Sequence, residues 1–184
     1  MNVKKTVIPE VLIIEPVLFG DHRGFFLETY QARRYVAAGI RRPFVQDNLS
    51  RSGQGVLRGL HLQNPFAQGK LVSVLRGCVL DVAVDVRVGS PTFGRHVAVE
   101  LSDENRRQLW IPRGFAHGFA VLSEAADVFY KCDEIYSPED EVSIRWDDPA
   151  IGIKWGIENP SLSAKDAAAP ILADVKILPA YGLS

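Results

Sequence analysis

The sequence is poor in cysteine, in net charge and in long apolar runs, and each shortage excludes a class of protein. Its two cysteines, Cys78 and Cys132, are too few for a disulfide framework and favour a reducing compartment. The formal net charge of −1 gives the whole chain no attraction for nucleic acid or an anionic membrane. No apolar run approaches a membrane span, and prolines and glutamates interrupt residues 9–16, where a signal peptide needs an uncharged core. We expect a soluble cytoplasmic protein without nucleic-acid or membrane partners.

What remains is the composition of an ordinary globular protein. Hydrophobic residues make up 47% of the chain and charged residues 23%, which excludes disorder as the default. A chain of 184 residues is long enough for one domain with a sizeable core. Because no linker, repeat or low-complexity tract divides it, we expect a single domain over residues 1–184.

Alternation with a period of two dominates the chain and predicts strands. Val82, Val84 and Val86 fall on one face of an extended segment, and the polar residues between them fall on the other. Gly, Pro, Asp and Asn turn signals separate several such segments. The expected strands are 70–75 and 79–87, joined by a short turn at 76–77, and then 96–101, 108–111 and 126–135. The pattern predicts an all-β, antiparallel jelly-roll barrel or sandwich.

Helical signal is minor. Residues 29–38, closed by Gly39, predict one short helix. A second short turn is expected to open at Ser163, with Asp166 as its capping partner, and to stop before Pro170. We therefore expect only a few short helices beside the strands.

Residues 55–63 resemble the first half of the cupin metal-site motif, a glycine followed after five residues by His-x-His and later by a glutamate. His61 is present, but Gln63 stands at the second histidine and Lys70 at the glutamate. The second cupin motif, Pro-x-Gly-x2-His, is present and ends at His117. Since an ammonium group repels a metal ion, we expect a cupin-like barrel with no metal, in which a histidine and a lysine face one cavity.

Three polar segments outside that motif suit a nucleotide ligand. Residues 21–28 combine an arginine, two aromatic rings and a carboxylate, which suit a phosphate, a base and an N–H group. A strand with a core Phe pair is the simpler interpretation. Residues 45–50 form a polar cluster that fits a plain Asx turn equally well. Arg58 and His61 fall on opposite faces of an ideal strand, and Gly59 is the residue that would bend it so that both reach one pocket.

A closer resemblance covers residues 21–170. The segments that carry it are 58–61, 68–72, 90–94, 110–119, 130–132, 136–138, 144–149 and 162–166. Together, and in this order, they are similar to the dTDP-4-dehydrorhamnose 3,5-epimerase family. The resemblance implies a cofactor-independent isomerase that inverts C3 and C5 of dTDP-4-dehydro-6-deoxy-D-glucose to give dTDP-4-dehydro-L-rhamnose, on the route to dTDP-L-rhamnose. It also implies a homodimer that exchanges an N-terminal strand.

The chemistry of such an inversion fits four residues. The C4 ketone acidifies the protons on C3 and C5, so the reaction needs a base, an acid across the ring and a positive group at the C4 oxyanion. His61 suits the base, because histidine titrates near neutral pH, and Lys70 suits the oxyanion. The resemblance places Asp166 behind His61 and makes Tyr130 the proton donor. A helix cap for Asp166 and a core aromatic for Tyr130 remain as alternatives.

The resemblance also implies a set of substrate-binding residues. They are Arg23, Phe25, Glu28, Gln46, Asp47, Asn48, Arg58, His117, Tyr136, Glu141 and Lys165. Residues 23–28 are expected to serve the pocket of the partner subunit, and Tyr136 to stack on thymine. An exposed strand tyrosine and solvated loop charges are the simpler interpretations of the last three.

Two departures from the family pattern leave the substrate open. Ser73 replaces a common arginine, and Gly156 follows Trp155 where a proline is usual. Relatives on the same scaffold epimerise only C3 or only C5, so a 3- or 5-epimerase of a secondary-metabolite pathway is one alternative. A metal-dependent cupin, such as a dioxygenase or phosphosugar isomerase, and a non-catalytic sugar-binding cupin are the others.

Overall fold

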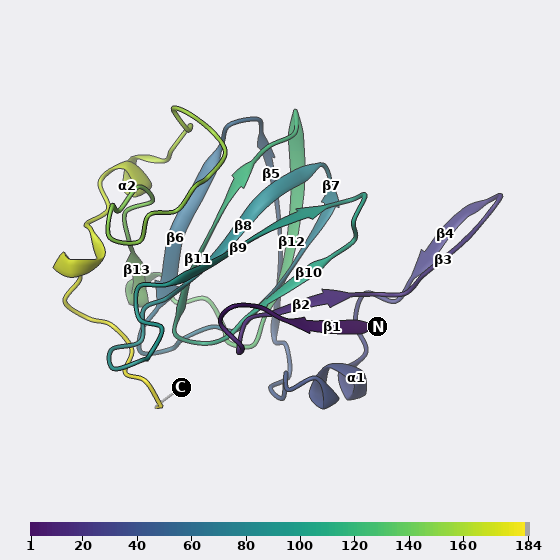
Figure 1. Ribbon diagram of the computed structural model, residues 1–184, viewed down its shortest axis with the longest axis horizontal. Helices are drawn as coiled ribbons and strands as arrows, with labels where there is room; N and C mark the ends of the chain where they lie inside the picture. Colours follow the sequence, from purple (N-terminus) through teal and green to yellow (C-terminus); the bar gives the residue numbers. More distant parts are fainter. Residues whose placement is uncertain (183–184) are drawn as a thin grey trace.

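The computed structural model describes residues 1–182, and its body is built on two antiparallel sheets packed face to face (Figure 1). In spatial order, the larger sheet contains β1 (Asn2–Lys5), β2 (Leu12–Glu15), β10 (Gln108–Ile111), β7 (Lys70–Arg76), β12 (Ala125–Cys132) and β5 (Gln46–Gly53). The smaller sheet contains β13 (Glu141–Ser143), β6 (Leu57–Gln63), β11 (Phe115–Val121), β8 (Cys78–Asp85) and β9 (His96–Ser102). The all-β jelly-roll class is confirmed.

The space between the sheets is filled by alternate residues of both. Val72, Leu109 and Val128 come from the larger sheet, Val79 and Phe119 from the smaller one, and none is more than 4% exposed. Burying each such side chain stabilises the fold by roughly 1.5–3 kcal/mol. This core occupies part of the region between the inner faces and holds the two sheets together there.

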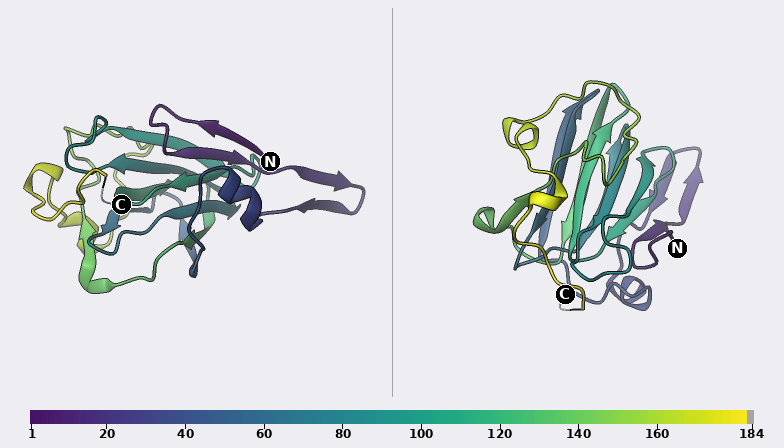
Figure 2. Two further views of the ribbon diagram at one scale, coloured as in Figure 1. Left: turned by 90° about the horizontal axis from the view of Figure 1, so that it is seen from below. Right: turned by 60° about the vertical axis from the view of Figure 1, so that its left-hand side comes forward.

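A second apolar layer covers the outer face of the smaller sheet. Val82 and Val84 of β8 and Leu60 of β6 pack there under Ile144 and Trp155 from the C-terminal segment. This segment includes α2 (Ala164–Ala167) and the 3-10 turn η2 (Leu172–Asp174), and it wraps along one side of the barrel (Figure 2). Both faces of β8 are therefore buried, and its valine face points to this cover rather than to the space between the sheets.

The helices are as short as expected. α1 (Ala32–Ala37) begins later than residue 29, because the Gln31 side chain accepts a hydrogen bond from Arg34 N at 2.8 Å and caps it. α2 opens at Ser163, whose hydroxyl accepts from Asp166 N at 3.1 Å, as predicted. The turn η1 (Pro138–Asp140) leads into β13. None of the helices in residues 1–182 is long and apolar enough to cross a membrane.

Some local expectations were wrong. β7 and β8 do not pair, although only Gly77 separates them, because the chain turns a corner there from one sheet to the other. Gly77 has φ +81°, which favours glycine. Residues 46–50 of the polar cluster belong to β5 rather than to an Asx turn, and β12 ends at Cys132 instead of Ile135.

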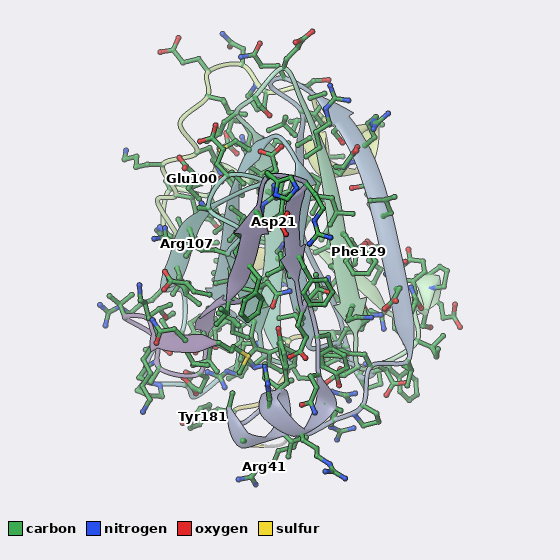
Figure 3. All side chains as sticks on the ribbon, turned by 90° about the vertical axis from the view of Figure 1, so that its right-hand side faces the viewer. Asp21, Arg41, Glu100, Arg107, Phe129 and Tyr181 are labelled. Carbon is green, nitrogen blue, oxygen red and sulfur yellow. The ribbon has the colours of Figure 1, made fainter. Side chains whose placement is uncertain are left out.

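A two-stranded hairpin projects from the body (Figure 1). It is made of β3 (Leu18–Asp21) and β4 (Gly24–Leu27), and Asp21 at its tip faces the viewer in Figure 3. Phe19, Phe25 and Phe26 are 62%, 53% and 68% exposed, so the interpretation of 21–28 as a strand with a core Phe pair is wrong. An isolated hairpin is marginally stable in water, which makes an uncovered aromatic hairpin unusual.

A buried ion pair holds the end of β8. Asp85 is fully buried and accepts hydrogen bonds from Arg87 Nε and Nη2 at 2.9 and 2.8 Å and from the hydroxyls of Ser90 and Thr92 at 2.5 and 2.6 Å. The Arg87 guanidinium carbon lies 4.9 Å from the ring centroid of Tyr181. Burial alone would raise the pKa of Asp85, but these donors lower it to about 2.

Asp85→Asn is expected to destabilise the protein in a pH-dependent way. A carboxylate whose pKa is lower in the folded state stabilises above its unfolded pKa of 3.8 and loses that contribution as pH falls toward about 2. The substitution should lower the free energy of unfolding by roughly 2 kcal/mol at pH 7, and the difference from wild type should shrink by about 1 kcal/mol at pH 3. Urea unfolding at both pH values measures it. Asp147→Asn, at a surface pair, is the control and should change little; equal stability of Asp85→Asn and wild type at pH 7 would contradict the prediction.

Candidate active site

The main cavity opens between the two sheets and has a volume of about 610 Å³. His61 and His117 reach it from β6 and β11 of the smaller sheet, and Lys70 and Tyr130 reach it from β7 and β12 of the larger one. Asp166 on α2 also lines it. The structure therefore brings together all four residues predicted as catalytic, and it places His61 and Tyr130 on opposite walls.

His61 is oriented by a carboxylate. Its Nε2 lies 2.5 Å from Oδ1 of Asp166, whose side chain is 4% exposed. Because a carboxylate only accepts, Nε2 carries the hydrogen, and in the neutral imidazole the lone pair is therefore on Nδ1. Burial alone would raise the pKa of Asp166, but the bond to His61 keeps it below the usual value. Ser163 is the helix cap, which leaves the Asp166 carboxylate for His61.

The bend at Gly59 lets Arg58 and His61 line the same cavity. Gly59 has φ +121°, and β6 shifts register against β11 at this point. A Cβ at Gly59 would lie 2.5 Å from Cα of Gly118 and 2.8 Å from the carbonyl oxygen of His117, so only glycine fits. The predicted role of Gly59 is confirmed.

Lys70 is a cation without a bonded anion. Among the described residues its ammonium group has no hydrogen bond or ion pair, and the side chain lines the cavity. Burial lowers the pKa of Lys70, which the neighbouring Cys132, Asp81 and Glu141 partly offset. A desolvated positive charge of this kind attracts an anion that forms in the cavity.

The Tyr130 hydroxyl likewise has no hydrogen-bond partner within residues 1–182, although the ring packs against the core. Burial raises the pKa of Tyr130, with a smaller opposing effect of Arg58. The hydroxyl therefore keeps its proton at neutral pH and points into a cavity that also holds a base. A core aromatic with a bonded hydroxyl, the alternative interpretation, does not describe this residue.

A second histidine–carboxylate pair was missed from the sequence. His117 Nε2 lies 2.9 Å from Oδ2 of Asp81, which is fully buried, and Oδ1 of Asp81 has no partner. The signal was an aspartate on the inward face of the valine-rich strand β8. Its face was predicted, but the neighbouring strand β11 was not, and that strand supplies the histidine.

Glu141 connects His61 to the rim of the cavity. Its Oε1 accepts from Lys165 Nζ at 2.8 Å and lies 3.9 Å from His61 Nδ1, while Oε2 accepts from the Tyr136 hydroxyl at 2.9 Å. Burial alone would raise the pKa of Glu141, but the bonds from Lys165 and Tyr136 keep it below the usual value. These three residues are thus joined in one network rather than separately solvated.

Gln63, at the lost histidine position of the metal motif, is 2% exposed and fully bonded. Its Nε2 donates to the carbonyl oxygens of Phe66 and Ile135 at 2.8 and 3.2 Å, and its Oε1 accepts from Ser137 N at 2.9 Å. The amide therefore holds the backbone on both sides of Tyr136. No group of three or more metal-binding side chains occurs in residues 1–182, and the donor set here suits hydrogen bonding rather than a metal.

An adjoining cavity of about 240 Å³ adds two predicted binding residues that do not line the main cavity, Gln46 and Asn48. It shares His61, Lys70 and Tyr130 with the main cavity. Gln46 Oε1 accepts from Tyr136 N at 2.9 Å. The binding amides therefore extend the same site.

Four predicted binding residues lie outside both cavities. Asp47 alternates to the other face of β5, where it pairs with Lys131 at 2.9 Å and is half-exposed. Arg23, Phe25 and Glu28 lie on or beside the projecting hairpin. Arg23 pairs with Asp21, and Glu28 with Arg34. None of the four lines either cavity of its own chain.

Three comparisons identify what the chain is similar to. Residues 5–174 match the family model of dTDP-4-dehydrorhamnose 3,5-epimerase. An enzyme of that name from Salmonella typhimurium is 58% identical over 175 residues, 94% of this chain and 96% of the relative. One from Shigella flexneri is 57% identical over 168 residues, 90% and 93% of the two chains. A crystal structure of dTDP-6-deoxy-D-glucose-3,5-epimerase from Legionella pneumophila, in complex with dTDP-4-keto-L-rhamnose, has 57% identity, a TM-score of 0.96 and 98% coverage of both chains.

Proposed function

The chain belongs to the dTDP-4-dehydrorhamnose 3,5-epimerase family, and from this premise we propose how its residues carry out the reaction. The protein is an isomerase that converts dTDP-4-dehydro-6-deoxy-D-glucose to dTDP-4-dehydro-L-rhamnose, in dTDP-L-rhamnose biosynthesis. An epimerase of a single carbon in a secondary-metabolite pathway is not favoured. The two free cysteines support a cytoplasmic location.

The observation that carries the mechanism is the placement of His61 and Tyr130 on opposite sheets around one cavity. Inversion requires removal of a proton from one face of the sugar ring and return of a proton to the other. His61, oriented by Asp166 at 2.5 Å, removes the proton from C3 or C5 through Nδ1. Tyr130, which keeps its proton because burial raises its pKa, delivers one from the opposite side.

The electrons of the broken C–H bond move into an enolate, whose negative charge is largest on the C4 oxygen. Lys70 supplies the positive charge for that oxygen, because its ammonium lines the cavity without a bonded anion in the described chain. His117, held by Asp81 at 2.9 Å, binds the sugar beside it. The two inversions use the same groups, because C3 and C5 are both adjacent to C4.

The nucleotide occupies the open end of the cavity. Arg58 lines it and has its Nε on the Ser52 hydroxyl at 3.1 Å, which leaves the other guanidinium N–H groups for the diphosphate. Lys165 adds a second cation at the rim, and the Tyr136 ring, which is 46% exposed, stacks on the thymine. Gln46 and Asn48 bind from the adjoining cavity.

We propose that two copies of the chain exchange their hairpins. The aromatic faces of β3 and β4 are exposed in the single chain, and a second copy would cover them. Arg23, Phe25 and Glu28 would then complete the partner's pocket, which lacks them in its own chain. The active enzyme is a homodimer on this proposal. A single domain over residues 1–184 stays a prediction, and residues 183–184 lie outside the described part.

His61→Ala should abolish deuterium exchange at both C3 and C5 of the 4-keto substrate in D2O. The base is lost, whereas the nucleotide contacts do not involve this side chain, so the affinity for dTDP should stay within about threefold of wild type. NMR of the substrate and calorimetry with dTDP measure the two effects. Exchange of either proton at close to the wild-type rate would show that another residue is the base.

Tyr130→Phe should separate proton removal from inversion. The ring and its packing remain, and His61 can still remove a proton and return a solvent deuteron to the same face. We expect measurable exchange but little C5-inverted product, with a decrease of inversion of about 100-fold or more. NMR of the product mixture measures both. A normal yield of the L-configured sugar would assign the proton donor to another residue.

Subunit mixing tests the exchanged hairpin. Arg23→Ala and His61→Ala enzymes should each have little activity at low substrate concentration, but a heterodimer contains one pocket with both residues intact if Arg23 acts in the partner's pocket. An equal, randomised mixture should recover about a quarter of wild-type activity. Arg58→Ala mixed with His61→Ala is the control, because both residues line the cavity of one chain and no pocket regains both. Absence of recovery with Arg23→Ala would contradict the exchange.

A further inference from the structure

Glu141 brings a second carboxylate to the imidazole of His61. It opens β13, which pairs with β6 so that Glu141 lies opposite Gln63 and Ser143 opposite His61. Asp166 occupies Nε2 of His61, and Oε1 of Glu141 lies 3.9 Å from Nδ1. Nδ1 is the nitrogen with the free lone pair, so Glu141 stands beside the atom that receives the substrate proton.

The reaction creates a need for such a group. During one inversion, His61 gains a proton from carbon, the C–H electrons enter the enolate, and the enolate takes a proton from Tyr130 to form the new C–H bond. The pair is left as imidazolium and phenolate. Before the next inversion, one proton has to leave His61 and another has to reach Tyr130, and water is the source and the sink of both. This requirement rests on the proposed function.

We propose that Glu141 accepts the proton from Nδ1 of His61 after each inversion and passes it to water, which returns the base to its active form. A movement of about 1 Å, or one bridging water, would convert the 3.9 Å separation into a hydrogen-bonded path. The proton moves from nitrogen to Oε1 and then to solvent, so the carboxylate is regenerated. Glu141 acts through His61 and makes no contact with the reacting carbons.

The surroundings of Glu141 suit a transfer group. Lys165 and Tyr136, which hold its two oxygens at 2.8 and 2.9 Å, have exposed side chains at the rim. The Glu141 side chain itself is 16% exposed, whereas that of Asp166 is 4% exposed. Because Lys165 and Tyr136 keep the pKa of Glu141 low, an accepted proton leaves quickly.

Other charges around His61 do not offer this route. The titratable groups that line the cavity with it are Arg58, Lys70, His117, Tyr130, Tyr136, Glu141, Lys165 and Asp166. Asp81, on β8, already binds His117 and is separated from His61, on β6, by the strand β11. Within the described residues, only Asp166 and Glu141 place a carboxylate oxygen within 4 Å of an imidazole nitrogen of His61.

Glu141→Gln tests the proposal, because an amide keeps the shape of the side chain but takes up no proton at neutral pH. Glu139→Gln, two residues away and exposed, is the matched control. Rapid-quench mass spectrometry in D2O counts deuterons incorporated per active site. The first deuteron is incorporated before His61 has to lose a proton, so Glu141→Gln should incorporate it at close to the wild-type rate. Every later deuteron requires His61 to be deprotonated again, and Glu141→Gln should incorporate these at least about tenfold more slowly. Wild type and Glu139→Gln should show no such burst.

Added imidazole buffer at constant pH should accelerate the slow phase of Glu141→Gln and leave wild type unchanged, because a small base can replace the missing acceptor. A role in packing or binding would not produce a burst. Two outcomes overturn the proposal: Glu141→Gln incorporates every deuteron as fast as wild type, or it is equally slow from the first deuteron onward with and without buffer. Failure of the proposed function differs from both, since wild type itself would then incorporate no deuterium at C3 or C5.

Discussion

The bond between His61 and Asp166 joins residues 105 positions apart, and the assembly of the pocket depends on it. Asp166 lies on a helix of four residues, which has no stability of its own in water. Its position comes from the C-terminal segment, whose Ile144 and Trp155 cover the outer face of the smaller sheet. The segment that covers the smaller sheet with apolar residues therefore also carries the carboxylate that orients the proposed base. A change that loosens the cover would therefore also disturb the carboxylate that orients His61.

The two facing sheets also place reactive groups on both sides of a bound sugar ring, as an epimerase requires. Facing sheets lie about 10 Å apart, which leaves room for one sugar ring where side chains are small or polar. Residues on regular strands are held more rigidly than residues on loops. The groups for the two faces of the ring, His61 and Tyr130, come from β6 and β12. Only the nucleotide contacts are left to the rim and to the proposed exchange of hairpins.

Much of this arrangement could be predicted because it depends on residues that are close together in the sequence. Period-two alternation predicted β8, β9 and β10, and motif spacing brought His61, Lys70 and His117 to one cavity, because both depend on the local pleat and on turns. Asp81 was missed, since alternation indicates the face of a strand but not its neighbour. The separation of β7 from β8 into different sheets is likewise a tertiary choice. The exposed Phe pair of the hairpin was assigned to a core because a single sequence does not distinguish a buried face from one that projects into solvent.

Gln63 gives the loss of the metal motif a structural meaning. Its Nε2 donates to the carbonyl oxygens of Phe66 and Ile135, and its Oε1 accepts from Ser137 N. A neutral imidazole has one N–H donor and one nitrogen acceptor, placed differently from those of an amide, so it would not reproduce these three hydrogen bonds. Returning a histidine to this position would release the loop that presents Tyr136. A metal site at this position would therefore require a new anchor for the loop that presents Tyr136, because the amide at the second histidine position of the motif is the group that holds that loop.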